Sequence, residues 1–429
     1  MARKMKDSGI EWIGEIPEGW ETINPKALFA QRKDRASKGE RQLTSSQQYG
    51  ILYQDEYMEL TGSKVVTVEK DFDILKHVEA GDFVISMRSF QGGLEYSTKS
   101  GAISSAYVML VPNLELVYPR FYRWLLKSSV YIDALQRTTN MVRDGQAMRY
   151  SNFAQVRLFT LPLDEQKSRA DFLDVKCSNI DKMLSKTRSS IEEYKKLKQA
   201  VITQAVTKGV RGKREMKDSG VEWIGEIPTT YSICKLKYLL KNPLKYGANE
   251  SGIPYSDSLP RYIRITDITP DGNLKCTGKL SLSEESAKDY ILEDGDILFA
   301  RSGATVGKTF IYYQSYGRSA YAGYLIKASL NNKVSPKFVY YYTCSSLYEI
   351  WKNSIFIQST IQNIGADRYA NLPVPVPKTL QEQEEIADYL DAKCTEIDGL
   401  IAKKEHLVKE LESYKKSLIY EVVTGKREV

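Results

Sequence analysis

The stretch MKDSGIEWIGEIP at residues 5–17 occurs again as MKDSGVEWIGEIP at residues 216–228, with Ile10 against Val221 as the only difference. A second repeat lies further along each half: LDVKC at residues 173–177 becomes LDAKC at residues 390–394. Such internal similarity at a regular spacing indicates duplicated structural units. The chain therefore has the order A–X–B–A′–X′–B′, in which the A and B elements are alike and the X segments diverge.

Shorter pairs at the same spacing support this order. They are Glu165-Gln166 with Glu382-Gln383, Ile180-Asp181 with Ile397-Asp398, and Pro119-Arg120-Phe121 with Pro336-Lys337-Phe338. Two copies of one unit favour an arrangement about a pseudo-two-fold axis. A length of 429 residues also exceeds what one core usually holds. We expect two recognition domains at residues 1–163 and 213–378, with long helices at 164–212 and 379–429.

The B elements are predicted to be long helices. No proline or glycine occurs from Asp164 to Lys208, and Gly209 and Gly425 are suitable helix ends. Apolar or small residues recur at helical spacing, which predicts one buried stripe on each helix. The first stripe comprises Leu173, Cys177, Ile180, Leu184, Ile191, Tyr194 and Val201, and the second Leu390, Cys394, Ile397, Ile401, Val408, Leu411 and Leu418. Gly399 is a weak point inside the second helix.

A helix of roughly 40 residues is about 60 Å long, so its apolar stripe needs a partner. We expect the two helices to form an antiparallel coiled coil that places the X domains at opposite ends. The alternative is that each helix packs on its own X domain. A domain of this size is only about 30 Å across, however, which a helix of this length would overhang.

The X segments are predicted to be α/β. Residues 262–268 alternate between apolar and polar side chains, as in a half-exposed strand. Residues 81–86 and 295–300 have the pattern of a turn followed by a buried strand. Pro119 and Pro336 each begin a predicted helix.

Composition excludes several classes of protein. Residues 1–7 lack the apolar core of a signal peptide, and no apolar run is long enough to span a membrane, so a cytoplasmic location is expected. The five cysteines are scattered and contain no C-x-x-C pair, which favours reduced thiols over a disulfide framework. Two histidines are too few for a histidine-based metal site.

The net charge of +7 fits either an ordinary, mildly basic protein or one that binds a polyanion. Charge alone does not separate these interpretations. The 29 tyrosines are expected mostly in the core or in surface packing, although a tyrosine-rich basic protein also has side chains suited to sugar–phosphate contacts.

The stretch from Arg301 to Thr309 imitates a phosphate-binding P-loop. That motif requires G-x-x-x-x-G-K-S/T, but Ser302 stands at its first position, and counting from Gly303 leaves the loop one residue short. A glycine-rich turn that presents polar side chains is therefore favoured over nucleotide binding. No dinucleotide fingerprint, no Asn-Pro-Pro-aromatic methylation motif and no Ser/His/Asp constellation is apparent, which predicts a protein without a catalytic centre.

The repeated elements carry a family resemblance. Residues 5–21, MKDSGIEWIGEIPEGWE, resemble the opening of specificity subunits of type I restriction–modification systems. The proline-then-EQ stretches at 161–166 and 377–383 are similar to the start of that family's long helices. Residues 295–309, GDILFARSGATVGKT, are similar to a segment frequent in its target-recognition domains. Residues 88–93 depart from that pattern, as a domain for a different half-site would require.

The resemblance implies a sequence-specific DNA-binding subunit that is not an enzyme. Each X segment would be a target-recognition domain for one half of a split DNA sequence, and the helices would set the distance between the halves. Modification subunits, two per chain, would dock on the helices and carry S-adenosylmethionine and the adenine methylation chemistry. Restriction subunits would carry ATP, Mg²⁺ and cleavage, so no cofactor is expected on this chain.

Candidate DNA-binding residues lie in polar, glycine-containing stretches, where loops present side chains to phosphates and base edges. In the first domain they are Arg88, Ser89, Gln91, Arg143, Gln146 and Arg149. In the second domain they are Arg301, Ser302, Thr305, Lys308, Gln358, Thr360, Gln362 and Asn363. Methylation requires an unstacked base, so the complex is expected to flip an adenine in each half-site.

The principal rival is a protein-interaction scaffold of two α/β modules on a coiled coil. The repeats and helices fit it equally well, whereas the basic loops and the family resemblance do not. An NTPase that uses residues 303–309 is a third interpretation, which predicts ATP binding by the isolated chain.

Overall fold

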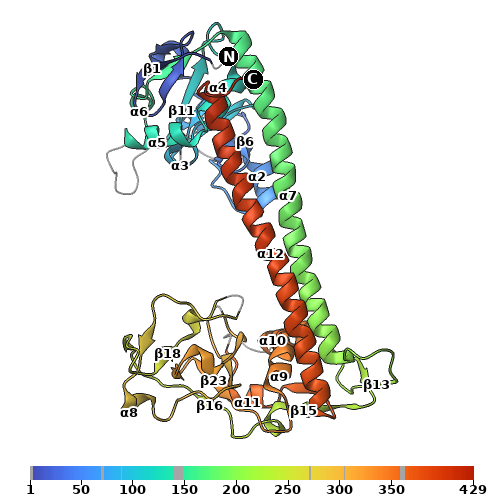
Figure 1. The fold of residues 1–429 in the computed structure, drawn as a ribbon. Helices are drawn as coiled ribbons and strands as arrows, with labels where there is room; N and C mark the ends of the chain where they lie inside the picture. Colours follow the sequence, from blue (N-terminus) through green and yellow to red (C-terminus); the bar gives the residue numbers. More distant parts are fainter. Residues whose placement is uncertain are drawn as a thin grey trace. The chain divides into compact units, whose positions relative to one another are not determined.

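The computed structural model describes residues 3–68, 72–87, 89–138, 148–269, 272–303, 305–357 and 363–429. It contains two compact units: unit 1 is Met1–Arg188 with His406–Val429, and unit 2 is Ser189–Glu405. Two long helices, α7 (Leu163–Lys208) and α12 (Leu380–Val423), each contribute one part to either unit (Figure 1). The predicted pair of long helices between α/β segments is confirmed.

Unit 1 is built around a four-stranded antiparallel sheet of order β4-β11-β8-β9. Its strands are β4 (Phe29–Arg32), β11 (Val108–Pro112), β8 (Phe83–Ile85) and β9 (Glu95–Tyr96). Two-stranded ladders join β1 (Met5–Ile10) to β2 (Gly14–Pro17), β3 (Glu21–Ile23) to β12 (Leu158–Thr160), β5 (Leu43–Ser46) to β6 (Gly50–Tyr53), and β7 (Lys76–Val78) to β10 (Gly101–Ile103). The helices are α1 (Pro25–Leu28), α2 (Gln54–Thr61), α3 (Ser89–Gly92), α4 (Pro119–Leu125), α5 (Ser129–Arg137) and α6 (Tyr150–Phe153).

Unit 2 has the same central order, β16-β23-β20-β21, again antiparallel throughout. These strands are β16 (Lys245–Tyr246), β23 (Leu325–Ala328), β20 (Ile297–Ala300) and β21 (Thr309–Ile311). The β13 (Met216–Asp218)–β14 (Glu226–Pro228) and β15 (Tyr231–Lys235)–β24 (Pro373–Pro377) ladders correspond to β1–β2 and β3–β12. A second sheet contains β17 (Ile253–Pro254), β19 (Leu280–Ser281), β18 (Arg261–Ile263) and β22 (Ser319–Tyr321). The helices are α8 (Glu284–Ala287), α9 (Pro336–Thr343), α10 (Ser346–Ile357) and α11 (Ala366–Ala370).

Several local predictions are confirmed. The turns at Gly81 and Gly295 lead into β8 and β20, whose residues are all buried. Pro119 and Pro336 are the first residues of α4 and α9. The fold is therefore duplicated at the level of strand order, although the X segments share little sequence.

The predicted half-exposed strand at residues 262–268 is wrong. Strand β18 ends at Ile263 and its three residues are all buried. The chain then turns, because the Asp267 carboxylate accepts hydrogen bonds from the backbone N–H of Arg264 at 2.9 Å and from its guanidinium at 2.7 Å. This local side-chain interaction competes with strand extension, and residues 265–267 form a 3₁₀ turn.

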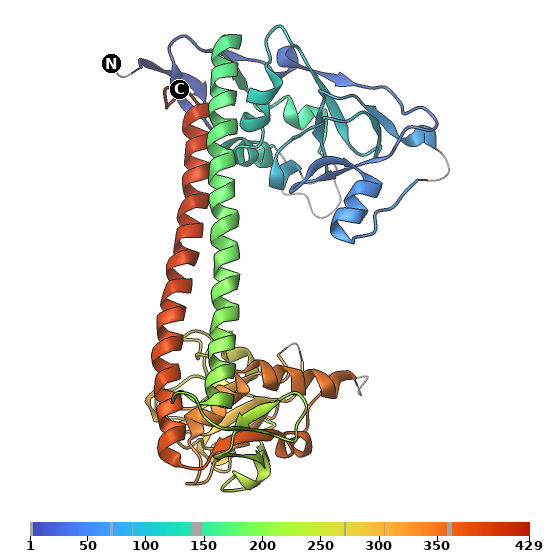
Figure 2. The same ribbon diagram turned by 90° about the vertical axis from the view of Figure 1, so that its right-hand side faces the viewer.

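The helices run antiparallel within each unit, as expected (Figures 1 and 2). In unit 1, Lys415 on α12 pairs with Asp181 on α7 at 2.7 Å, and Arg188 pairs with Glu412. In unit 2, Lys198 pairs with Asp398 at 2.6 Å. Helix α12 continues through Gly399.

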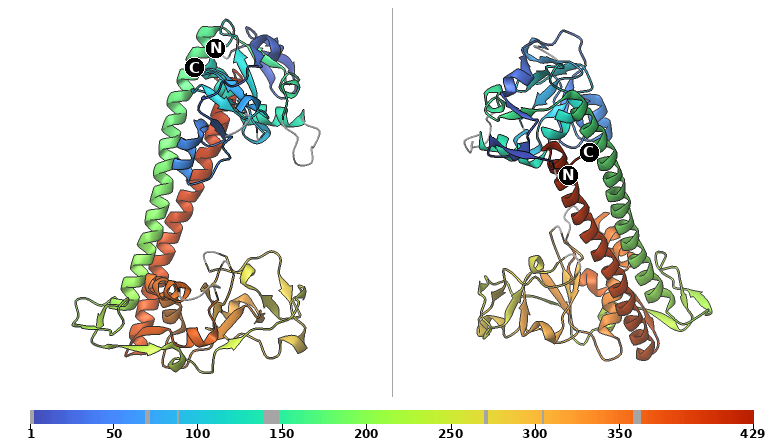
Figure 3. Two further views of the ribbon diagram at one scale, coloured as in Figure 1. Left: turned by 180° about the vertical axis from the view of Figure 1, so that it is seen from behind. Right: turned by 45° about the horizontal axis from the view of Figure 1, so that its top comes forward.

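The two helices end at Gly209 and Gly425, as predicted, both with positive φ. Close approach also requires a small residue at each end. A Cβ at Gly425 would lie 2.5 Å from Pro17 Cγ, and one at Gly209 would lie 2.8 Å from the Tyr231 hydroxyl. The β13–β14 hairpin lies beside this end of α7 (Figure 3), with Ile224 and Ile227 in one core with Ile202 and Val206.

The predicted stripe residues divide by burial. Leu173, Ile180, Leu184, Ile191, Leu390, Ile397 and Leu418 are buried, as are Cys177 and Cys394. Tyr194, Val201, Ile401, Val408 and Leu411 are half-buried. In unit 1, the stripe of α7 forms one core with Leu418, Val422 and the module of residues 1–163. Helix pairing and packing on the module therefore occur together.

A buried glutamine joins each long helix to its module. In unit 1, Gln166 Oε1 accepts the backbone N–H of Tyr118 at 2.7 Å, and its Nε2 donates to the carbonyls of Leu116 and Leu161. Tyr118 is the residue before α4, so one side chain positions the start of that helix. Gln383 accepts from Ser335 before α9 and donates to the carbonyls of Lys333 and Pro377 in the same way.

The neighbouring glutamate joins each helix to residues that flank its A segment. Glu165 accepts hydrogen bonds from Arg3, from Arg169 at 2.7 Å and from the indole of Trp20 at 3.1 Å. Glu382 accepts from Arg214 and from the Tyr231 hydroxyl, which occupy the matching positions of the second copy. The repeated EQ pair thus forms a joint in two parts. It attaches the frame, by which we mean the long helices and the A segments, to the module of each unit.

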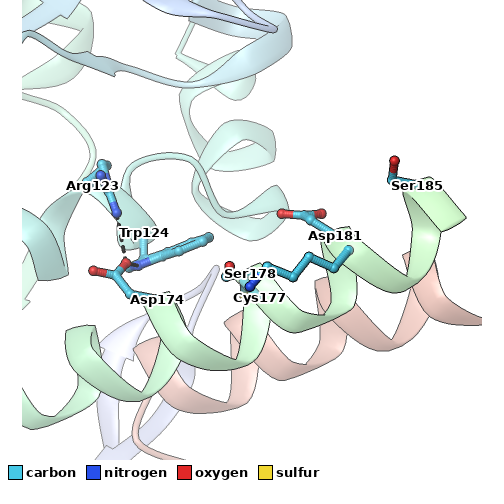
Figure 4. A pocket seen from close by; sticks show the side chains of 8 residues that line it. Arg123, Trp124, Asp174, Cys177, Ser178, Asp181 and Ser185 are labelled. Carbon is cyan, nitrogen blue, oxygen red and sulfur yellow. Dashed lines mark hydrogen bonds and ion pairs between the residues drawn. The ribbon is translucent and has the colours of Figure 1, made fainter.

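A third contact lies two turns further along. The Asp174 carboxylate accepts hydrogen bonds from Arg120, from Arg123 at 2.8 Å and from the Trp124 indole at 2.8 Å (Figure 4). Asp391 makes the matching contacts with Lys337 and the Tyr341 hydroxyl. The repeated aspartate of the LDxKC motif therefore binds α4 or α9 to the long helix.

Replacing Gln383 with alanine should destabilise unit 2. The substitution leaves the Ser335 N–H and the Pro377 carbonyl buried without their partner, at a cost of roughly 1–3 kcal/mol for each unsatisfied group. Exposed Gln381, two positions away, is the matched control, and its alanine variant should change stability by less than about 0.5 kcal/mol. Chemical denaturation measures both. Equal unfolding midpoints for the two variants would contradict the joint.

The Glu165 joint should make unit 1 sensitive to acid. Burial raises the pKa of Glu165, but hydrogen bonds from Arg3, Arg169 and Trp20 outweigh burial and lower it to about 2. A carboxylate with a depressed folded pKa stabilises the fold above its unfolded pKa, and this contribution disappears as the pH falls from about 4.5 to about 2.

Glu165→Gln should therefore lose roughly 2–3 kcal/mol at neutral pH and show a flatter stability profile in that acidic window. Thermal unfolding measured from pH 2 to pH 7 tests this expectation. Exposed Glu115 supplies the control substitution, Glu115→Gln. A profile for Glu165→Gln that is as steep as the wild type would show that another group dominates.

Candidate nucleic-acid interface

The loop from Arg301 to Lys308 in unit 2 joins two antiparallel strands, β20 and β21. Its ends are closed by hydrogen bonds from Ala300 N to Lys308 O at 2.8 Å and from Gly307 N to Ala300 O at 2.9 Å. A P-loop instead connects a strand to a helix, whose N-terminus binds the phosphates. The geometry of this loop therefore differs from that of a nucleotide-binding loop.

Two buried tyrosines position the loop from beneath. Tyr348 on α10 donates to Gly307 O at 2.7 Å, and Tyr369 on α11 donates to Ala300 O at 2.8 Å. Burial raises the pKa of both phenols, so both remain hydroxyl donors. Gly307 has φ of +81°, and a Cβ there would meet the Lys352 side chain. The loop is consequently a well-supported projection of the sheet.

The second predicted stretch of unit 2 meets this loop. Ser302 and Asn363 form an isolated β-bridge, and Ile364 N donates to Arg301 O at 2.8 Å. Asn363 is exposed, whereas Ser302 is half-buried. Gln358, Thr360 and Gln362 lie outside the described residues. Two segments about 60 residues apart in sequence thus come together at one edge of unit 2.

Arg301 has an unusual environment for a half-buried cation. Its guanidinium carbon lies 5.0 Å from the centre of the Tyr246 ring, within the range of a cation–π interaction. In the described part of the chain the guanidinium makes no ion pair, and its Nε is buried without an acceptor. Its backbone N–H donates to the carbonyl of Tyr324 at 3.0 Å. The terminal nitrogens are therefore available to an external acceptor.

Thr305 and Lys308 are the remaining candidate residues of this loop. Both side chains are half-buried, and Lys308 Nζ donates to the carbonyl of Thr269 at 3.2 Å. The Lys308 N–H closes a turn onto Thr305 O. These residues therefore support the shape of the loop.

The corresponding loop of unit 1 is different. It contains the short helix α3, in which Gln91 is exposed. Ser89 is buried, and its hydroxyl accepts the backbone N–H of Ser86 at 2.9 Å, so its position favours a structural role over base contact. Arg149 is exposed immediately before α6. Arg88, Arg143 and Gln146 lie outside the described residues.

A buried ion pair lies next to the loop of unit 1. Glu95 on β9 pairs with Lys127 at 2.7 Å, and burial raises the pKa of this carboxyl. Gly93 packs against the backbone, since a Cβ there would lie 2.4 Å from Leu126 O. The glycines of this loop, Gly92 and Gly93, therefore allow close packing, whereas the loop of unit 2 forms an open turn.

The sequence interpretation missed two tyrosines of unit 2. Tyr246 on β16 and Tyr324 in the turn before β23 are 41% and 62% exposed, and both contact Arg301. Their residue type was a weak signal, because tyrosine is common throughout the chain and most positions are ordinary packing. Only the sheet order brings these residues to the Arg301 loop.

An open pocket lies between α4 and α7 in unit 1 (Figure 4). It is lined by Arg123, Trp124, Asp174, Cys177, Ser178, Asp181, Lys182 and Ser185. Burial raises the pKa of the Cys177 thiol to about 11, so the sulfur remains a neutral packing group. The residues that line the pocket therefore include no activated nucleophile.

None of the helices in the described ranges combines the length and apolar character needed to cross a bilayer. Across the same residues, no group of three or more histidine, cysteine, aspartate or glutamate side chains is arranged to hold a metal ion.

Known proteins share this sequence pattern. A family model described as the type I restriction modification DNA specificity domain matches residues 248–410. The type I restriction enzyme MjaVIII specificity subunit of Methanocaldococcus jannaschii is 24% identical over 366 residues, which cover 81% of this chain and 80% of that protein. The putative MjaX specificity subunit of the same organism is 24% identical over 448 residues, covering 96% and 95%.

The chain is similar to type I restriction–modification specificity subunits over most of its length, and residues 248–410 match their DNA specificity domain. Solved structures of such subunits have the same fold. The HsdS subunit from Thermoanaerobacter tengcongensis aligns with a TM-score of 0.53 at 16% identity, covering 96% of this chain and 98% of that chain.

A chain solved in work on complex assembly and conformational transition of the type I R-M system aligns with a TM-score of 0.73 at 14% identity, covering 96% and 99%. The specificity-domain match begins just after Tyr246 and includes the Arg301 loop, Asn363 and the first part of α12. The candidate interface of unit 2 therefore lies in and beside the family's DNA specificity domain.

Proposed function

We propose that this specificity subunit recognises a split DNA sequence, with one recognition module for each half-site. The observation that carries this proposal is the combination of equal frames with unequal loops. The EQ joints and the aspartate contacts are the same in both units, whereas one loop presents Arg301 and the other contains α3. The modules extend over residues 1–163 and 213–378, and α7 (Leu163–Lys208) and α12 (Leu380–Val423) form the spacer between them.

The proposed contacts follow from exposure and charge. Arg301 and Asn363 would contact base edges in the major groove, where arginine recognises guanine and asparagine recognises adenine. Ser302, Thr305 and Lys308 would support them and contact phosphates. In unit 1, exposed Gln91 and Arg149 remain candidates, together with Arg88, Arg143 and Gln146.

Modification and restriction subunits are the proposed protein partners. The relatives are named as subunits of restriction enzymes, and one structural neighbour comes from work on assembly of the type I R-M system. The long helices expose apolar side chains that an additional subunit would cover, among them Val175, Met183, Leu197, Leu407 and Tyr414. Methylation and cleavage, with their S-adenosylmethionine, ATP and Mg²⁺, would take place on those partners.

Methylation mapping tests the function directly. The chain is co-expressed with its modification subunit, and N6-methyladenine is located by single-molecule sequencing. A split motif with two specific halves and a constant gap is expected. No new methylation by subunits that are shown to associate would favour a protein-interaction scaffold instead.

A module exchange tests the assignment of half-sites. Replacing residues 231–376 with the corresponding segment of another specificity subunit should change one half of the methylated motif and leave the other half and the gap unchanged. Because the joints use repeated residues, the exchanged module should still attach to the frame. Changes in both halves would refute the modular assignment.

Arg301→Ala should relax one base position of the half-site assigned to unit 2. Loss of a bidentate contact to guanine costs roughly 1–3 kcal/mol. Affinity for the intact motif and for each single base-pair substitution is measured by fluorescence anisotropy with the complex that contains the modification subunit. Arg318→Ala is the control, because Arg318 is already paired with Glu284 at 2.6 Å. Unchanged discrimination by Arg301→Ala would remove Arg301 from the interface.

A further inference from the structure

We propose that Tyr246 is a positioning residue for sequence recognition in unit 2, which holds the Arg301 guanidinium in the orientation that contacts guanine. The inference rests on the proposed function and adds a specificity determinant to it. Tyr246 acts through Arg301 and need not contact the base itself. The discrimination of one base position should therefore depend on the aromatic ring at position 246.

The geometry limits what else could orient Arg301. The guanidinium carbon lies 5.0 Å from the Tyr246 ring centre, and the buried Nε has no acceptor among the residues that the structure describes. The same part of the chain offers it no carboxylate partner. A long flexible side chain without hydrogen bonds from its own protein would lose conformational entropy on binding. The ring supplies the contact that reduces this loss.

Tyr246 is itself held at both ends. Its backbone pairs with Ile326 in the β16–β23 ladder, and its hydroxyl accepts the N–H of Ala366, the first residue of α11, at 3.0 Å. The ring is therefore part of the scaffold and not a mobile surface side chain.

The backbone of Arg301 is held by the same neighbourhood. Its N–H donates to Tyr324 O at 3.0 Å, and its carbonyl accepts Ile364 N at 2.8 Å. Segments 245–246, 301–302 and 363–366 thus form one connected assembly. With its backbone and one guanidinium face held, the terminal nitrogens of Arg301 remain for the planar, bidentate pattern of acceptors that guanine presents in the major groove.

The test compares Tyr246→Leu with Tyr246→Phe in the complete complex of the chain, its modification subunit and duplex DNA of the mapped motif. Binding is measured for the motif and for every single substitution in the half-site of unit 2. Tyr246→Leu removes the π face and should lower discrimination roughly 3- to 30-fold at the position that Arg301→Ala relaxes. Tyr246→Phe keeps the ring and should keep most of the discrimination.

A double-mutant cycle separates positioning from general stabilisation. In the Arg301→Ala background, Tyr246→Leu should cause no further loss at that base position, because the residue that it orients is absent. Tyr238→Leu is the matched control. This tyrosine of unit 2 is 68% exposed, and the centre of its ring lies 5.1 Å from Lys237 Nζ. It should leave discrimination unchanged.

Three results would overturn the inference. Two of them are a loss by Tyr246→Leu that is uniform over all sequences and a loss that adds fully to that of Arg301→Ala. Wild-type complex that methylates a split motif while both variants keep full discrimination would reject the role of Tyr246 and leave the proposed function intact. Wild-type complex without any sequence preference would instead reject the proposed function.

Discussion

The buried glutamine in the first turn of each long helix is the contact on which the rest of the structure depends. An amide side chain can accept a backbone N–H and donate two hydrogens at once, and Gln166 and Gln383 each make these three hydrogen bonds. Each therefore connects three points of the chain: the long helix, the strand that leads into it, and the start of α4 or α9. Losing the side chain would leave several backbone groups buried without partners, so the joint tolerates little change.

The charged contacts around each joint are also repeated in the two copies. Glu165, Glu382, Asp174 and Asp391 are all paired with cations or polar hydrogens of residues that flank the A segment or of the helix that begins at Pro119 or Pro336. The second copy replaces Trp20 with Tyr231 and Trp124 with Tyr341, yet both replacements still donate to the same carboxylate. What is retained is the hydrogen-bond donor, and the shape of the aromatic group is free to vary.

Arg301 shows the opposite arrangement. The frame arginines have carboxylate partners, whereas Arg301 rests on an aromatic ring and offers its terminal nitrogens outward. A loop supported from beneath by Tyr348 and Tyr369 can change its outer residues without disturbing the sheet that carries it. Such separation allows two modules with equal frames to carry different recognition surfaces, as the contrast between the Arg301 loop and α3 illustrates.

Much of the fold could be predicted from the sequence, because long-range repetition and helical periodicity survive in the residues themselves. The helices between Pro162 and Gly209 and before Gly425, and the buried strands after Gly81 and Gly295, follow from local chemistry. The strand expected at residues 262–268 failed, because the Arg264–Asp267 interaction ends it after three residues. The alternation of apolar and polar residues gives no information about a side chain that hydrogen-bonds to the backbone of a nearby residue.

The candidate interface was predictable only in part. Arg301 and Asn363 could be selected as polar residues of glycine-containing stretches, and the structure brings their segments together. Ser89 was selected for the same reason but is buried, because a hydroxyl in a tight turn can satisfy a backbone N–H as well as an external ligand. Tyr246 could not be distinguished from the other tyrosines, since its proposed role depends on contact with Arg301, which is 55 residues away in sequence.

By itself, the sequence determined the duplicated order and the two long helices, since each depends on residue type at a short or repeated spacing. Tertiary structure alone decided which polar residues face outward, which partners the EQ pair binds, and that Arg301 has no ion-pair partner among the described residues. Those properties depend on the order of strands in a sheet, and hydrogen bonds between strands distant in the chain leave no regular spacing for a sequence pattern to record.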